Sequence, residues 1–341
     1  MSGESAIATH NVSLEATKIG ALESVYALVL EDFKATNSLI PRLLTSDVGL
    51  VEEIGQHIIE SGGKRLRPLM VLLASRGCGY EARDHVKLAV IIEFLHTATL
   101  LHDDVVDRSD LRRGRATANA TWGNAPSVLV GDFLYSRAFE LMVELGDLRI
   151  LGVLSEATNG IAEGEVLQLS NVGNCQISEA QYMEVIRRKT ALLFQAATHS
   201  AAMLGCQSPA KQEALRDFGL HFGLAYQLVD DWLDYAGAAD AMGKNVGDDL
   251  AEGKLTLPLI HALARGNATQ TRTLREAIAA KSHAALPAVL SIVRQTGALD
   301  YTQALAQRQS EKAVRCLAAL PDNEFKEALD TLARFAVARL N

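Results

Sequence analysis

The stretch "LLHDDVVDRSDLRRGRAT", residues 100–117, places three carboxylates, those of Asp103, Asp104 and Asp107, within five positions and follows them with arginines. The apolar residues around the aspartates favour a helix. Because residues four apart lie on one side of a helix, Asp103 and Asp107 share a face. Such carboxylates repel unless a cation lies between them. Oxygen ligands of this kind suit Mg²⁺, which completes its shell with water and substrate phosphate.

The same acidic pattern occurs a second time. "DDWLD" contains Asp230, Asp231 and Asp234, and the apolar segment "FGLAYQLV" precedes it. Two such motifs on separate helices could face each other across a cavity and hold a diphosphate through several metal ions. A single copy could equally be a solvated helix end, but two copies favour the metal site. The spacing DxDxDG of an EF-hand is missing.

Composition excludes several other classes of protein. The 341 residues are 48% hydrophobic and carry a net charge of −8, which argues against a nucleic-acid or anionic-membrane binder. The four cysteines are far apart and form no metal pattern, as expected of reduced thiols. No secretory signal and no apolar run of 18 residues is visible. We therefore expect a soluble cytoplasmic protein with no membrane span.

Helical periodicity dominates the chain. Leu88, Ile92, Leu95 and Thr99 follow each other at helical spacing, and strand-like alternation is nearly absent. We predict an all-α, single-domain bundle of ten or more helices over residues 21–341, after a flexible segment at 1–20. The Gly- and Asp-rich stretch 237–255 is typical of a functional loop.

Basic clusters accompany the acidic motifs. "SGGKRLRP" (61–68) joins a glycine pair to cations suited to phosphate, although its spacing is not that of a P-loop. "DLRRGR", "RRKT" and the lysines of the loop add further positive charge. Each cluster alone is more often a solvated helix end, whereas their combination with the twin motifs favours diphosphate binding. His96 lies seven residues before Asp103, and a core role and a phosphate-donor role remain equally open for it.

From about Thr45 to Arg265, the sequence resembles the trans-isoprenyl diphosphate synthases, and among them the bacterial octaprenyl diphosphate synthases that supply ubiquinone side chains. The resemblance depends on motifs in register: "GGKRLRP", "HTATLLHDDVVD", "RRGRATAN", "VLVGDFLYSRAF", "AEGEVLQL", "KTALLF", "QLVDDWLD", "GKNVGDDLAEGK" and "TLPLI". Trp232 and Leu255 depart from the usual residues, but neither matches a ligand position.

The resemblance implies an all-α fold around a central cavity, a homodimer, and a condensation that depends on Mg²⁺, with three ions per site. Asp103, Asp107 and Asp230 would bind the metal. Catalytic and allylic-substrate positions match Arg112, Lys189, Thr190, Gln227 and Lys244. Isopentenyl diphosphate positions match Lys64, Arg67, His96 and Arg113.

The resemblance also bears on product length. Family members that make short products carry an aromatic residue four or five positions before the first aspartate, where this chain has Thr99 and Ala98. On a helix, Thr99 lies about 40° from Asp103 and Ala98 about 140° away, so Thr99 is better directed at the cavity. We therefore expect a long-chain product, although small residues here could simply pack helices.

Several alternatives remain open at this point. The product could be octaprenyl, which we favour, or nonaprenyl or shorter. A terpene cyclase would lack the "GGKRLRP" segment, and a non-catalytic partner subunit would be expected to lose one of the two DDxxD motifs. A metal-dependent nucleotide hydrolase would need ExxE patterns. No side-chain base is evident, so we expect the diphosphate itself to accept the proton.

Overall fold

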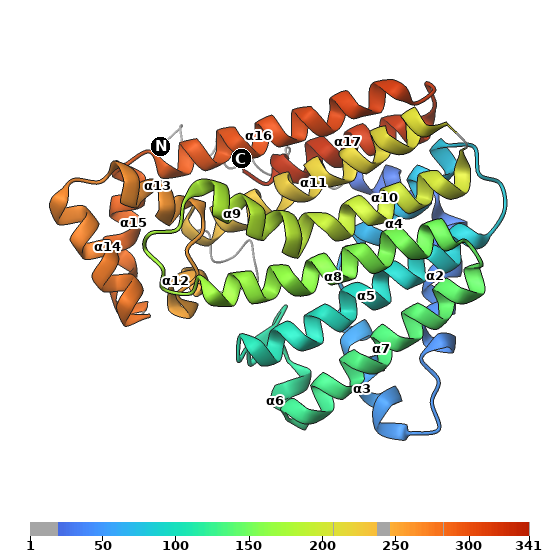
Figure 1. The fold of residues 1–341 in the computed structure, drawn as a ribbon, viewed down its shortest axis with the longest axis horizontal. Coiled ribbons are helices and arrows are strands. Elements are labelled where there is room, and N and C mark those ends of the chain that lie inside the picture. The colour runs from blue at the N-terminus through green and yellow to red at the C-terminus, as the bar shows by residue number, and fades with distance from the viewer. Residues whose placement is uncertain (1–19, 207, 237–245, 282, 341) are drawn as a thin grey trace, which may run out of the picture.

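The computed structural model describes residues 20–206, 208–236, 246–281 and 283–340. Within these ranges it has the sixteen α-helices α2–α17, a further helical stretch at 20–28 and one two-stranded ribbon, so the all-α prediction of ten or more helices is confirmed (Figure 1). The expected flexible segment at 1–20 lies almost wholly outside the described residues.

The elements are α2 (Leu30–Leu43), α3 (Gly49–Glu60), α4 (Leu66–Gly77), α5 (Asp84–Val106), β1 (Leu111–Arg112), β2 (Arg115–Ala116), α6 (Ala118–Trp122), α7 (Asn124–Leu145), α8 (Leu148–Ser170), α9 (Glu179–Ile186), the π-helical segment η1 (Arg187–Ala191), α10 (Leu192–Gly205), α11 (Pro209–Ala236), α12 (Asp248–Glu252), α13 (Leu257–Arg265), α14 (Ala268–Ala280), α15 (Leu286–Gln295), α16 (Ala298–Cys316) and α17 (Glu324–Ala338), with 3₁₀ turns at His283–Ala285 and Leu317–Ala319.

Helices α4 and α5 are buried over most of their length. Every residue of α4 from Pro68 to Ser75 is buried, and most of α5 is buried on all sides. A helix that is apolar all round needs neighbours all round. Accordingly α5 packs against α4, α7 and α10, and α11 packs against α10, α16 and α17. The two helices that carry the acidic motifs are therefore held rigidly from several sides.

A tight hairpin follows the first acidic motif. Strands β1 and β2 pair Leu111 with Ala116 and Arg112 with Arg115. The two loop residues, Arg113 and Gly114, have φ of 53° and 75°. Two successive left-handed residues make a type I′ turn, which matches the twist of a two-residue hairpin. The segment "LRRGR" thus folds back on itself and brings its arginines toward the end of α5.

The buried apolar side chains form two clusters. One is built largely on α4, α5, α7, α8 and α10, and the other on α11, α13, α14, α15 and α16. Residues of both clusters, among them Phe194 and Ile177, also line the main cavity. Among the described residues, no helix is long and apolar enough to cross a membrane.

Candidate active site

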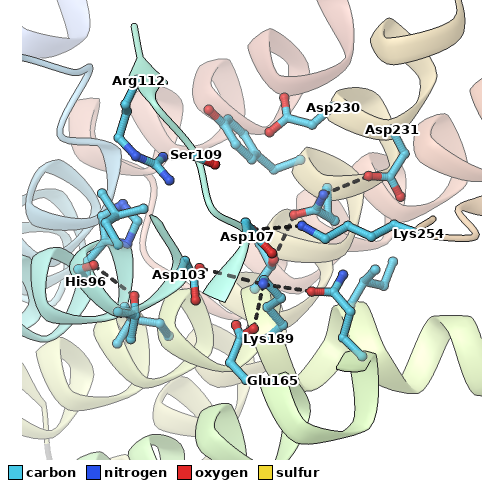
Figure 2. Close-up of a pocket in the computed structure, with 18 of the residues that line it drawn as sticks. His96, Asp103, Asp107, Ser109, Arg112, Glu165, Lys189, Asp230, Asp231 and Lys254 are labelled. Atoms are coloured by element: carbon cyan, nitrogen blue, oxygen red, sulfur yellow. Dashed lines mark hydrogen bonds and ion pairs between the residues drawn. The ribbon is translucent and has the colours of Figure 1, made fainter. Parts of the chain in front are cut away.

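A cavity of ≈ 700 Å³ receives both acidic motifs. Asp103 lies in the last turn of α5, Asp107 caps that helix, and Asp230 lies near the end of α11. All three line the cavity, and Figure 2 shows Asp230 across it from the first motif. The spacing argument thus correctly identified two aspartates that share one face of α5, and the bundle brings the second motif opposite to them.

The three carboxylates of the first motif have different partners. Asp103 lies 3.6 Å from Lys189 Nζ, and Asp107 accepts a hydrogen bond from Lys254 Nζ at 2.8 Å. Burial raises the pKa of Asp103, while the Lys189 ammonium opposes this shift. Asp104 turns away and accepts bonds from Nε and Nη2 of Arg112, at 2.9 and 2.7 Å. Only Asp103 and Asp107 therefore present their charge to the cavity.

The carboxylates of the second motif all line the cavity but have different partners. Asp230 accepts a bond from Arg339 Nη2 at 2.7 Å. Asp231 is buried and accepts from Tyr182 and Gln227. Asp234 accepts from the backbone N–H groups of residues 247–249, at 3.1 to 3.3 Å. Burial and the nearby Asp249 raise the pKa of Asp234 to about 8. Asp230 and Asp234 share a face as expected, but Asp234 holds a loop.

A basic wall lines another part of the same cavity. Lys64, Arg67, His96 and Arg113 all line the cavity. A Cβ on Gly63 would lie 2.4 Å from Nη1 of Arg113, so the glycine gives this guanidinium its place. Gly63 also has φ of 140°, which other residues rarely adopt. The second glycine of "GGKRLRP" therefore has a structural reason, which is the close approach of an arginine from the hairpin.

His96 is a neutral acceptor within this wall. Arg67 Nη1 lies 3.2 Å from His96 Nε2, and since the guanidinium can only donate, the ring nitrogen accepts. Burial and the charges of Arg67, Arg112 and Arg113 hold the pKa of His96 well below its usual value. Burial also lowers the pKa of Arg67 to about 10, and its guanidinium stacks 4.0 Å from the Phe194 ring centroid. The imidazole thus orients Arg67 and leaves the charge on the arginine.

Lys189 and Thr190 lie in the π-helical segment η1. Such wide turns are frequent at functional sites. Two glycines let neighbouring helices approach it closely: a Cβ on Gly164 of α8 would lie 2.8 Å from Lys189 N, and one on Gly223 of α11 would lie 2.6 Å from Ala191 Cα. Lys189 Nζ contacts Glu165, Gln168 and Asp103, and Thr190 donates to Gln227 Oε1 at 2.7 Å.

The two residues expected to affect product length differ in position, and one predicted substrate-binding residue is not described. Thr99 lines the cavity and donates its hydroxyl to the backbone oxygen of His96 at 2.8 Å. Ala98 is fully buried and is not among the lining residues, in agreement with the helical-wheel preference for Thr99. Lys244 lies outside the described residues.

Sequence reasoning missed several residues of the site. Arg339 reaches Asp230 from just beyond α17, 109 positions along the chain, and no local spacing could reveal this contact. Glu165 lies in the segment "AEGEVLQL", but its partner Lys189 is distant in sequence. Tyr182 was not distinguished from a core tyrosine. Each of these contacts joins separate helices, so the missing information was tertiary.

The donors fit a hard divalent cation that also binds substrate. Among the described residues, no group of three or more His, Cys, Asp or Glu side chains is assembled closely enough to hold a metal by itself. Asp103 and Asp107 nevertheless offer oxygens to the cavity, and the ammonium groups of two lysines balance their charge. Mg²⁺ is typically bound through one or two carboxylates together with water and phosphate oxygens. The residues therefore fit Mg²⁺ delivered with a diphosphate.

The fold and the paired acidic motifs define the class of all-α isoprenoid synthases. The family model described as polyprenyl synthetase matches residues 48–294. The chain belongs to this family.

Known relatives match almost the whole chain. Octaprenyl diphosphate synthase of Escherichia coli is 50% identical over 93% of this chain and 99% of its own length. The all-trans-nonaprenyl-diphosphate synthase (geranyl-diphosphate specific) of Rhodobacter capsulatus is 47% identical over 93% of this chain and 98% of its own. A crystal structure of polyprenyl synthase from Caulobacter crescentus, complexed with calcium and isoprenyl diphosphate, is 47% identical, with a TM-score of 0.90 over 93% and 97% of the two chains.

Proposed function

We propose that this protein is a long-chain all-trans polyprenyl diphosphate synthase that adds isopentenyl diphosphate to an allylic diphosphate such as farnesyl diphosphate. The observation that carries the proposal is the meeting of Asp103, Asp107 and Asp230 with the basic wall around one cavity. The likeness to the octaprenyl synthase of Escherichia coli supports octaprenyl diphosphate as the product, for the ubiquinone side chain.

The cavity divides into two diphosphate sites in this proposal. The allylic diphosphate lies between the acidic walls, where Arg112, Lys189 and Lys244 add positive charge. Isopentenyl diphosphate lies at the basic wall, held by Lys64, Arg67, His96 and Arg113. Guanidinium groups suit this task because they offer two parallel donors to phosphate oxygens. Charge separates the substrates, since three carboxylates line the first site, whereas arginines surround the carboxylate of Glu93 at the basic wall.

Asp103, Asp107 and Asp230 would hold Mg²⁺, three ions per site as the resemblance implies. When bound, Mg²⁺ supplies positive charge to the oxygens of the departing diphosphate. The lysines and arginines around the site add fixed positive charge at the same place, which is preorganised electrostatic catalysis. The aspartates thus act as metal holders, and none of them needs to transfer a proton.

The reaction breaks one bond and forms another. The C1–O bond of the allylic substrate ionises, and the double bond of isopentenyl diphosphate attacks the resulting cation at C1. A proton then leaves the isopentenyl unit, and we infer that the released diphosphate accepts it. Water must be excluded because it would trap the cation. Thr190 and Gln227 are polar but not nucleophilic in this setting, and both line the cavity.

We propose that the enzyme acts as a homodimer in the cytoplasm. Large apolar side chains are exposed on α7 and α8, where a second copy could cover them: Leu129, Val143, Leu148, Val166 and Leu169. The four cysteines have free thiols, which suits a reducing compartment.

Product analysis tests the proposal. Purified protein is incubated with farnesyl diphosphate, labelled isopentenyl diphosphate and Mg²⁺, and the dephosphorylated product is sized by reversed-phase thin-layer chromatography. An octaprenyl product is expected. A nonaprenyl product would support the second candidate, which the 47% identity to the Rhodobacter capsulatus enzyme favours. Binding of prenyl diphosphates without any elongation would indicate a non-catalytic subunit and overturn the proposal.

A further inference from the structure

Four side chains in the wall of the cavity form a continuous line of hydrogen bonds. Tyr182 Oη of α9 donates to Asp231 Oδ2. Gln227 Nε2 donates to Asp231 Oδ1 at 2.8 Å, and Thr190 Oγ1 donates to Gln227 Oε1 at 2.7 Å. The line joins α9, η1 and α11. Tyr182 and Asp231 are only 3% and 4% exposed, so protein rather than water sets the direction of the bond between them.

Asp231 sets which group donates and which accepts along this line of hydrogen bonds. An ionised carboxylate has no hydrogen to donate, so both of its neighbours must donate to it. Burial raises the pKa of Tyr182 well above its usual value, which keeps this hydroxyl a donor. Burial and the charge of Asp249 also raise the pKa of Asp231. A proton on Oδ2 would still leave Oδ1 as an acceptor for Gln227, so the amide keeps its orientation in either state.

This orientation matters for a cation in the cavity. Because Gln227 Nε2 is engaged by Asp231, its Oε1 faces Thr190 and accepts the Thr190 proton. The lone pairs of the Thr190 oxygen are then left for the cavity, and the carbonyl oxygen of Gln227 lies beside them. A reversed amide would instead bring an NH₂ group, with its partial positive charge, to this place. A preorganised dipole of the right sign stabilises developing charge, and one of the wrong sign opposes it.

We propose that Asp231 and Tyr182 are positioning residues, which hold the Gln227 amide so that the oxygens of Gln227 and Thr190 face the allylic cation. The inference rests on the proposed function, because it requires this cation. It gives Asp231 a different role from its neighbour Asp230. Asp230 binds metal and substrate, whereas Asp231 orients the Gln227 amide.

Three variants and one control test the inference. Asp231→Leu removes both acceptors. Asp231→Asn keeps an oxygen for Gln227, while its NH₂ can donate to the Tyr182 oxygen. Tyr182→Phe removes one donor. Tyr301→Phe is the control, because it also removes a tyrosine–carboxylate bond, here to Glu179 at 2.8 Å and outside the cavity lining. The measurements are kcat, the Mg²⁺ concentration for half-maximal rate, and the ratio of farnesol to elongated product from labelled farnesyl diphosphate.

Asp231→Leu should lower kcat by about tenfold or more, on the scale of one lost electrostatic contact. It should also raise the farnesol ratio, because a poorly stabilised cation reacts with water, while the Mg²⁺ requirement stays as in the wild type. Asp231→Asn should recover most of the loss, Tyr182→Phe should be intermediate, and Tyr301→Phe should match the wild type.

Other outcomes would overturn the inference. If the kcat of Asp231→Asn falls as far as that of Asp231→Leu, and this variant also needs more Mg²⁺, then the charge of Asp231 contributes to metal binding. The inference is also contradicted if Asp231→Leu folds and gives the same ratio of farnesol to elongated product as the wild type. If Asp231→Leu fails to fold, Tyr182→Phe decides: kinetics equal to Tyr301→Phe would overturn the inference. A wild-type protein that elongates nothing would instead refute the proposed function.

Discussion

The first acidic motif shows that three neighbouring aspartates can have two purposes. Asp103 and Asp107 face the cavity, while Asp104 is 1% exposed and paired with Arg112. The four-residue spacing was sufficient to predict the first pair, because helix geometry alone sets which residues share a face. The pairing of Asp104 could not be predicted, because it depends on how the hairpin folds back on α5.

Removing Asp103 tests the metal-holding proposal. Asp103→Ala should lower kcat by about 100-fold or more even at saturating Mg²⁺, since an electrostatic contact to the leaving group is lost. Asp322→Ala is the control, because this exposed carboxylate pairs with Lys326 away from the cavity lining, and its removal should leave turnover unchanged. Turnover is measured by incorporation of labelled isopentenyl diphosphate. Near-normal turnover of Asp103→Ala would refute the assignment.

His96 predicts a pH dependence of stability. Its pKa in the folded protein lies below the value of about 6.5 in the unfolded chain, so the unfolded state takes up the proton first. The contribution of His96 to the free energy of unfolding should therefore be greatest above pH 6.5 and fall as the pH drops below it. One group contributes at most about 1.4 kcal/mol per pH unit.

Urea unfolding at pH 7.5 and 5.5 measures this effect. The wild type should lose more unfolding free energy between the two values than His96→Gln does, since the other histidines are common to both proteins. Equal losses in the two proteins would show that His96 is not held neutral.

At the scale of elements, the sequence predicted helices well and their local distortions poorly. Periodicity revealed the buried face of α5, where Leu88, Ile92 and Leu95 are all buried. It did not reveal η1, because a π turn is specified by what packs on it. Gly164 and Gly223 provide that packing, and their only signal in the sequence is glycine inside a helix.

Gly223→Ala should disturb η1. The new Cβ would lie 2.6 Å from the Ala191 backbone, so we expect a loss of about 1–3 kcal/mol in unfolding free energy, together with lower kcat as Lys189 and Thr190 shift. Gly152→Ala is the matched control, because nothing lies within 4 Å of its Cβ position in α8. It should stabilise the protein by about 0.5–1 kcal/mol. Urea unfolding and steady-state kinetics compare the two, and equal effects would contradict the packing argument.

Thr99 offers a test of product length on α5. Thr99→Phe should shorten the product, because the new ring would enter the cavity close to the first acidic motif. Ala98→Phe serves as comparison: Ala98 is fully buried outside the lining, so overpacking should lower the melting temperature. Thin-layer chromatography of the products decides. An unchanged chain length for Thr99→Phe would mean that the floor of the cavity lies elsewhere.

For the whole molecule, the sequence predicted that the acidic motifs meet and that basic clusters accompany them, but not which helices pack around the site. Two repeated motifs imply a shared cavity, whereas the choice of neighbouring helices depends on tertiary packing. Arg339 illustrates the difference, since it comes from the far end of the chain and pairs with Asp230.

The exposed apolar side chains on α7 and α8 lead us to predict a dimer. Val143 and Val166 are 69% and 65% exposed, and a double change to glutamate should convert a dimer into a monomer. Light scattering after size-exclusion chromatography measures the mass. Val48→Glu, at a position 58% exposed outside these helices, should remain dimeric. A monomeric wild type would refute the dimer.

The pairing of Asp104 with Arg112 has a consequence for evolution. Removing either partner alone would strand a charge in the interior, at a cost of about 3–5 kcal/mol. Substitutions at these two positions should therefore arise together during evolution. Asp103 and Asp107 should each be retained for a separate reason, because both serve substrate binding. A relative with a neutral pair at positions 104 and 112 would keep the hairpin packed on α5, but it would lack the positive charge that Arg112 adds at the allylic diphosphate.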